Sequence, residues 1–112
     1  MSFEIRTTPG FERSAKVLSK RHRSLKADLK ELMLSLSSNP FQGDELTPGV
    51  REIRMAITSK GRGKSGGARV ITFTIVVEEN SGTVYLLDIY DKSDFASVEI
   101  SVIKELIEEL EL

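Results

Sequence analysis

A run of eight β-branched or aromatic residues, 70–77, directly follows a glycine-rich basic segment, 60–69. Such side chains pack well on a pleated sheet, so the run predicts a strand. Before it, the glycines free the backbone and expose its N–H groups, while the Lys and Arg residues between them add positive charge. We therefore expect segment 60–69 to be a mobile loop that can meet phosphate oxygens.

The residues of this loop match one nucleotide-binding motif and part of a second. Gly61, Gly63 and Gly66 have the spacing of the dinucleotide fingerprint G-x-G-x-x-G. That fingerprint needs a helix after the loop, whereas a strand is predicted here. A P-loop would need a glycine at Thr58, upstream of the Gly-Lys-Ser that begins at Gly63. We interpret both matches as chance.

Length and composition limit the classes of function. The 112 residues suit one domain, 1–112, and contain neither a run of 18 apolar residues nor a signal-peptide pattern. The absence of cysteine excludes disulfides and thiol catalysis, and a single histidine, His22, excludes a His-rich metal site. Three aspartates at 88, 91 and 94 lack the spacing of an EF-hand. We expect a cytoplasmic protein without metal, cofactor or membrane association.

The net charge of −1 hides an uneven distribution. Residues 1–30 carry eight Lys or Arg against three Asp or Glu, and residues 51–69 carry six against one. Residues 99–112 carry five Glu and one Lys. A polyanion can therefore dock on one side of the molecule, unless these charges only form a solvated surface.

Two helices are predicted after a short strand at 3–7. Thr8-Pro9 is a helix start, with Thr as the N-cap and Pro at the first helical position. Residues 19–23 predict a polar break, and Asn39-Pro40 ends the second helix. Apolar side chains follow helical spacing in both segments: Phe11, Ala15 and Leu18, then Leu25, Leu29, Leu32 and Leu36. We expect a helical hairpin packed on a sheet.

Three strands and a last helix follow a loop at 41–50. The strands are expected at 52–58, 70–77 and 84–90, with a hairpin turn at 79–82. The helix, capped near Ser97, places four apolar side chains on one face: Ile103, Leu106, Ile107 and Leu110. That face favours packing on the sheet over folding across the basic surface. The order β-α-α-β-β-β-α indicates an α+β fold with a small, antiparallel-rich sheet.

Four residues stand where adjacent strands can meet a ligand. Arg54 points away from the apolar side of its strand, and Arg69 begins the next strand. Lys92 lies two residues beyond Tyr90, so these two point the same way if the strand continues. Such residues can converge on one concave face. The alternatives are an exposed strand position for Arg54 and a packed ring for Tyr90.

Arginine, lysine and tyrosine without a metal suit the attack of an RNA 2′-hydroxyl on its own phosphodiester. This reaction needs a stabilised phosphorane and some proton transfer. Arginine can hold the non-bridging oxygens bidentately, and a lysine beside other cations can take or give a proton.

Several short pieces of the chain occur together in a known order and spacing. They are Asn39-Pro40 with Gly43, Leu46 and Gly49, then Ile53-Arg54, then the segment 63–71, and finally the segment 86–94. With the helical hairpin before them, the whole chain resembles the RelE/ParE superfamily of toxins from bacterial type II toxin–antitoxin modules. It is most similar to the RelE/HigB-like branch.

The resemblance implies a compact sheet with an N-terminal helical hairpin, and metal-independent cleavage of mRNA in the ribosomal A site that inhibits translation. It also implies silencing by a cognate antitoxin protein encoded beside the toxin, for example a small helix-turn-helix protein. The implied catalytic residues are Arg54 and Arg69 on the phosphorane, Lys92 for charge or proton transfer, and Tyr90 on a base or the 2′-hydroxyl. Lys60, Arg62 and Lys64 are the implied contacts to the RNA backbone.

Two alternatives stay open. The ParE branch shares the fold but inhibits DNA gyrase without cleaving nucleic acid, and fold alone does not decide between them. A nucleic-acid-binding module without toxicity is the other. The Lys-Ser-Gly-Gly-Ala-Arg loop and the Tyr-x-Lys ending favour the ribonuclease.

Overall fold

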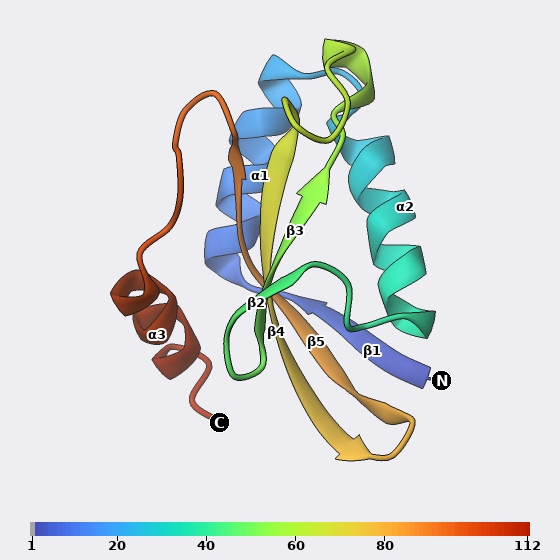
Figure 1. Cartoon of the computed structure of the whole chain (residues 1–112), viewed down its shortest axis with the longest axis vertical. Helices are drawn as coiled ribbons and strands as arrows, with labels where there is room; N and C mark the ends of the chain where they lie inside the picture. The colour runs from blue at the N-terminus through green and yellow to red at the C-terminus, as the bar shows by residue number, and fades with distance from the viewer. Residues whose placement is uncertain (1) are drawn as a thin grey trace.

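The computed structural model describes residues 2–112, which form a five-stranded sheet with three α-helices (Figure 1). The sheet has the order β1-β5-β4-β3-β2. Its strands are β1 (Ser2–Thr7), β2 (Asp44–Thr47), β3 (Val50–Met55), β4 (Ala68–Glu78) and β5 (Ser81–Asp91). β1 runs parallel to β5, and every other neighbouring pair is antiparallel. The fold is therefore α+β with a mostly antiparallel sheet.

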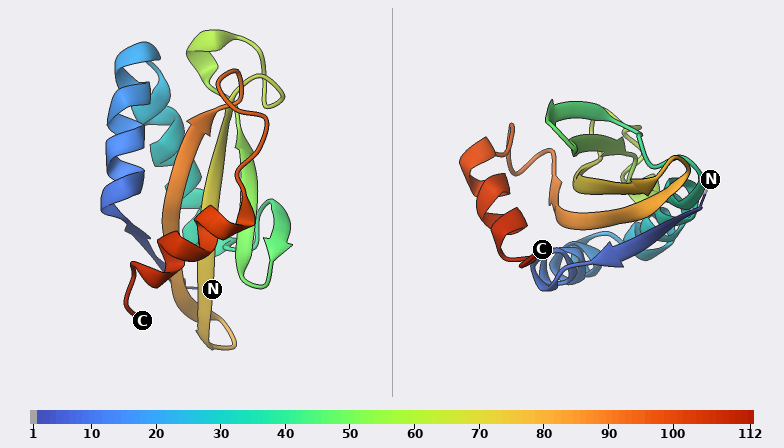
Figure 2. Two further views of the ribbon diagram at one scale, coloured as in Figure 1. Left: turned by 90° about the vertical axis from the view of Figure 1, so that its left-hand side faces the viewer. Right: turned by 90° about the horizontal axis from the view of Figure 1, so that it is seen from below.

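The helices cover both faces of this sheet. α1 (Pro9–Arg21) and α2 (Leu25–Ser38) pack on one face, where their apolar side chains join those of β3, β4 and β5 in the larger core. α3 (Ile100–Glu108) packs on the other, where Ile103 is fully buried in a second, smaller core (Figure 2). The predicted apolar faces of α2 and α3 are the faces that pack. No helix within residues 2–112 combines the length and apolar character needed to span a membrane.

The start of α1 is the one that the sequence predicts. Pro9 lies in the first turn, and the Thr8 Oγ1 accepts a hydrogen bond from the Phe11 N–H at 3.2 Å. The same hydroxyl lies 3.1 Å from the Leu86 carbonyl oxygen, to which it can donate. This cap therefore ties the beginning of α1 to β5.

Several element boundaries differ from the predictions. α1 continues to Arg21, so the helical break covers only residues 22–24. α3 begins at Ile100, and no side chain caps it, so the predicted cap near Ser97 is wrong. The turn between β4 and β5 is only the pair 79–80.

The predicted order lacks one strand, β2, which lies within the expected loop 41–50. It pairs with β3 through Asp44 opposite Glu52 and Glu45 opposite Arg51. β3 itself ends at Met55, and a short 3-10 helix, η1 (Thr58–Lys60), follows it. The observed strand and α-helix order is therefore β-α-α-β-β-β-β-α.

A buried carboxylate fixes η1 against α2. Asp28 accepts hydrogen bonds from the Thr58 N–H at 3.0 Å and the Thr58 hydroxyl at 2.6 Å, and from the Ser24 hydroxyl at 2.8 Å. Burial disfavours its charged form, but these hydrogen bonds outweigh burial and hold the pKa of Asp28 below its usual value. The basic loop therefore starts from a fixed point, at the same end of the molecule as the α1–α2 connection (Figure 1).

Candidate functional site

Three of the predicted site residues form one row across the sheet. Arg54 on β3 lies directly opposite Arg69 on β4, and Arg69 lies directly opposite Tyr90 on β5. Cross-strand partners point to the same face of a sheet. Since Tyr90 belongs to the smaller core, this row lies on the face that α3 covers, away from α1 and α2.

A pocket of about 300 Å³ opens along this row. We call it the sheet pocket, and its lining residues are Asp44, Leu46, Glu52, Arg54, Ser65, Arg69 and Lys92. Three of the four predicted catalytic residues therefore meet in one cavity, although they come from three separate strand regions. Tyr90 does not line it but contacts Glu52, which does.

Arg69 is the least exposed of these residues, with 4% of its surface accessible. Its Nη1 donates to the Lys64 carbonyl at 2.9 Å and to its neighbour Ala68 at 3.1 Å, and its Nη2 donates to the Ser65 carbonyl at 3.2 Å. Most of its donors are therefore used to fold the end of the glycine loop. This geometry gives Arg69 a role in holding the loop and leaves Arg54, which is exposed, as the freer cation.

Glu52 connects Arg69 with Tyr90. The Tyr90 hydroxyl donates to the Glu52 Oε1 at 3.3 Å, and the Arg69 Nε lies 3.7 Å from the same oxygen. Burial and the neighbouring Glu52 charge raise the pKa of Tyr90 to about 12. Tyr90 is therefore a hydrogen-bond donor at neutral pH and cannot act as a base there.

Sequence reasoning did not select Glu52, although it lines the sheet pocket. The spacing could have indicated Glu52 as a site residue, because Glu52 and Arg54 are two residues apart on one strand and share a face. Charge alone could not separate it from other exposed strand positions. Its importance appears only when β4 and β5 bring Arg69 and Tyr90 to its carboxylate.

Lys92 lines the sheet pocket from the end of β5. Its backbone N–H donates to the Gly67 carbonyl at 3.0 Å, and its Nζ donates to the Ala96 carbonyl at 2.7 Å. These contacts fix Lys92 between the end of β5 and the glycine loop. Its ammonium keeps two further donors for a ligand.

The three residues predicted to bind RNA have different surroundings. Lys60 is half-buried, and its Nζ donates to the Asp91 Oδ1 at 2.9 Å. Arg62 and Lys64 are exposed, and they line different cavities. Lys64 lines a groove of about 770 Å³ between α2 and β3, whereas Arg62 lines a separate basic pocket with Lys92.

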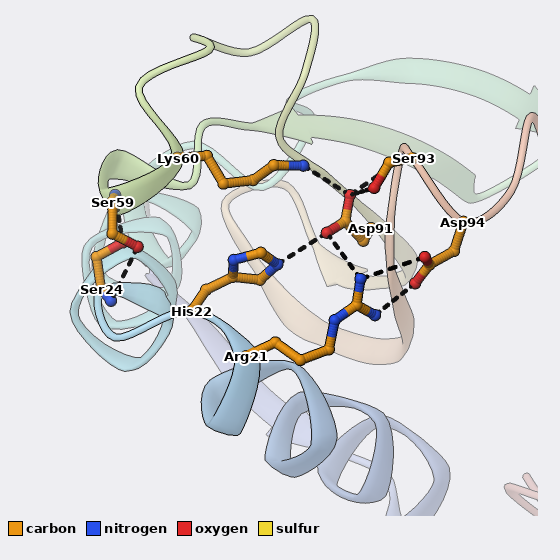
Figure 3. A network of polar contacts seen from close by, with 8 residues as sticks. All are labelled: Arg21, His22, Ser24, Ser59, Lys60, Asp91, Ser93 and Asp94. Atoms are coloured by element: carbon orange, nitrogen blue, oxygen red, sulfur yellow. Dashed lines mark hydrogen bonds and ion pairs between the residues drawn. The ribbon is translucent and has the colours of Figure 1, made fainter.

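Asp91 is the centre of an ion-pair network at this end of the sheet (Figure 3). Only 1% of it is exposed, and it contacts Arg21 at 3.5 Å, His22 at 2.8 Å and Lys60 at 2.9 Å. The Ser93 N–H and hydroxyl also donate to it, at 2.9 and 2.7 Å. Burial opposes its ionisation, but these hydrogen bonds prevail and hold the pKa of Asp91 well below its usual range.

His22 stands between Arg21 and Arg23 in the predicted helix break, where the sequence alone predicts a surface residue, and this network shows that prediction to be wrong. The His22 side chain is only 14% exposed because its Nε2 faces the buried Asp91. It therefore connects the end of α1 to β5 and, through Asp91, to Lys60.

The glycine loop leads directly into β4, as its sequence predicts. A strand instead of a helix follows Gly61, Gly63 and Gly66, which agrees with the interpretation of the dinucleotide fingerprint as chance. Gly61 and Gly63 have left-handed φ values of 68° and 63°. Gly67 is needed for a different reason, since a side chain there would collide with the Met55 carbonyl.

No group of three or more His, Asp or Glu side chains in residues 2–112 is arranged to hold a metal ion. A search of protein-family models finds none that matches this chain.

Proposed function

We propose that this protein is a RelE/ParE-like toxin that cleaves mRNA on the ribosome without a metal. The observation that carries the proposal is the sheet pocket, which Glu52, Arg54 and Lys92 line together beside a basic glycine loop. A carboxylate and separate cations are the groups that phosphodiester transesterification needs. A cognate antitoxin, encoded next to the toxin, would silence it.

Three residues of the pocket act on the RNA in this proposal. Glu52 takes the proton of the RNA 2′-hydroxyl, whose oxygen then bonds to phosphorus. The exposed guanidinium of Arg54 binds the non-bridging oxygens as their charge grows. The bond from phosphorus to the 5′-oxygen breaks, and the Lys92 ammonium gives that oxygen a proton. The product is a 2′,3′-cyclic phosphate.

The two buried residues act through Glu52 in this mechanism. The Tyr90 hydroxyl orients the carboxylate with its hydrogen bond of 3.3 Å. Arg69 places a positive charge beside the same carboxylate and holds the loop that borders the pocket. They are positioning residues, whereas Glu52, Arg54 and Lys92 touch the substrate.

The test is to induce the wild type and Arg54→Ala in growing cells and to map 5′ ends on an abundant mRNA, with translation running and blocked. The wild type should produce cuts that need translation, and Arg54→Ala should reduce them by about 10²-fold. Lys16→Ala, which removes an exposed charge from α1, is the matched control and should cut like the wild type. Growth arrest with a DNA damage response and no cuts would indicate a gyrase inhibitor instead. Neither arrest nor cuts would leave a non-toxic nucleic-acid-binding module.

A further inference from the structure

A second basic pocket lies next to the sheet pocket. We call it the loop pocket; it has a volume of about 340 Å³ and is lined by Lys60, Arg62, Gly66, Lys92 and Ser93. Lys92 lines both pockets, and Ser65 lines the sheet pocket while the next residue, Gly66, lines the loop pocket. The two cavities are therefore neighbours, separated by the Lys92 side chain and one stretch of loop backbone.

The partition between the pockets is well fixed. The partition consists of Lys92 and the loop backbone, and the hydrogen bond of 3.0 Å from the Lys92 N–H to the Gly67 carbonyl joins these two parts. On the loop side, the stem of Arg62 lies against Gly66, where an added Cβ would be 2.6 Å from the Arg62 Cβ. The glycine thus lets Arg62 lie along the wall of the loop pocket.

The charge of the loop pocket suits an anion. Three cations line it, and no carboxylate does. Asp91 accepts a hydrogen bond from one of the three ammonium donors of Lys60, so two donors stay available. Arg62 is exposed, and within residues 2–112 its guanidinium has no ion pair or hydrogen bond. The Ser93 hydroxyl also lines the pocket, but it donates its proton to Asp91 at 2.7 Å, so the cations are the donors left for an anion.

We propose that the loop pocket binds a second phosphate of the RNA strand, next to the phosphate held in the sheet pocket. This inference rests on the proposed function, because it makes both cavities parts of one substrate track. Lys92 lies between successive phosphates and contacts both. Arg62 recognises the second phosphate and takes no part in the chemical step.

The experiment measures binding of a single-stranded 2′-O-methyl RNA, which has no free 2′-hydroxyl and cannot be cleaved by this route. Its affinity is measured by fluorescence anisotropy over a range of salt concentrations for the wild type and Arg62→Ala. Arg13→Ala is the matched control, because it removes an exposed arginine from α1 that lines neither pocket. Lys60 is left intact, since its loss would leave Asp91 with fewer partners.

For Arg62→Ala, the slope of log K against log salt should become shallower by about 0.7, the effect of one lost phosphate contact on a single strand. Arg13→Ala should keep the wild-type slope. A dinucleotide lengthened by one nucleotide should gain affinity for the wild type, and Arg62→Ala should lose that gain.

Equal effects of the two substitutions would overturn the inference, because they would indicate a diffuse basic surface. Failure of the inference and failure of the proposed function are distinguishable. An unchanged slope for Arg62→Ala, together with mRNA cuts in cells that need Arg54, would remove only the second phosphate site. A changed slope without cuts in cells would keep the phosphate site and remove the nuclease.

Discussion

The Nε of Arg69 lies 3.7 Å from the Oε1 of Glu52, at the centre of the row that crosses β3, β4 and β5. Arg69 is buried, and its other donors hold the carbonyls of Lys64 and Ser65. One side chain therefore joins the pocket carboxylate to the fold of the glycine loop. Its loss should affect stability as well as any activity.

Replacement of Arg69 by alanine should lower the free energy of unfolding by about 3–5 kcal/mol, because it leaves partly buried carbonyls without donors and Glu52 without its ion-pair partner. Arg54→Ala, at an exposed position one strand away, should change it by less than about 0.5 kcal/mol. Urea denaturation of both variants measures the difference. Wild-type stability in Arg69→Ala would show that the loop does not depend on this side chain.

Glu52→Gln should separate chemistry from folding. The amide keeps the shape of the side chain and can still accept the hydrogen bond from Tyr90, but it cannot take a proton. We expect cleavage to fall by about 10²–10⁴-fold. Circular dichroism and thermal unfolding check that the fold persists. Full activity in Glu52→Gln would exclude this carboxylate as the base.

Tyr90 should make the stability of the protein depend on pH in the alkaline range. Because its pKa is raised from 10.0 to about 12, the folded protein keeps the Tyr90 proton where the unfolded chain loses it. Its contribution to stability is complete below pH 10 and is lost as pH rises toward about 12. Tyr90→Phe should therefore flatten the fall of stability in that range, as measured by urea denaturation at several pH values. An equally steep fall in Tyr90→Phe would show that other groups cause it.

The parts of the fold that the sequence predicts depend on local signals. Thr8 caps α1 because its hydroxyl serves the nearby Phe11 N–H, and the leucines of α2 are buried because their spacing matches one helical face. Arg54 is exposed because Ile53 and Met55 occupy the core.

The parts that it does not predict depend on distant partners. β2 has one large apolar residue, Leu46, and forms because β3 provides a backbone to pair with. His22 and Asp91 are 69 positions apart, and nothing in the sequence around either residue indicates that their side chains are in contact. The same holds for Glu52, whose contact with Tyr90 exists only after three strands align.

The Asp91 network should make the fold sensitive to acid. The pKa of Asp91 is lowered in the folded protein, so its contribution to stability is present above the ordinary value of 3.8 and is lost as pH falls below it. Asp91→Asn should lower the free energy of unfolding by about 3–5 kcal/mol at neutral pH. Arg21, His22 and Lys60 would then face a neutral amide in place of the buried carboxylate. This variant should also show a weaker further loss below pH 4 than the wild type.

Asp94→Asn is the control for this experiment, since Asp94 also pairs with Arg21 but is partly exposed. Its effect on stability at neutral pH should stay below about 1 kcal/mol. Thermal unfolding between pH 2 and pH 7 compares the two variants. Equal losses in both would mean that Arg21 alone matters and that Asp91 does not organise this end of the sheet.

Gly67 should be the least replaceable glycine of the loop. Its Cα lies against the Met55 carbonyl where β3 and β4 begin to pair, and a methyl group would collide with backbone atoms that cannot rotate away. Gly67→Ala should therefore destabilise the protein by more than about 2 kcal/mol and disturb the hydrogen bond from the Lys92 N–H. Amide hydrogen exchange at Lys92 reports on that bond directly.

Gly10→Ala provides the matched control, because the new Cβ would meet only the Arg13 side chain at 3.8 Å, in ordinary van der Waals contact. Gly10 lies in α1 with a helical backbone that alanine adopts without strain, so this variant should be about 0.4–1 kcal/mol more stable than the wild type. Opposite signs for the two substitutions would show that close backbone approach, rather than chain flexibility, requires glycine at 67. A Gly67→Ala protein with unchanged stability and unchanged exchange at Lys92 would show that the partition between the two pockets does not need that close approach.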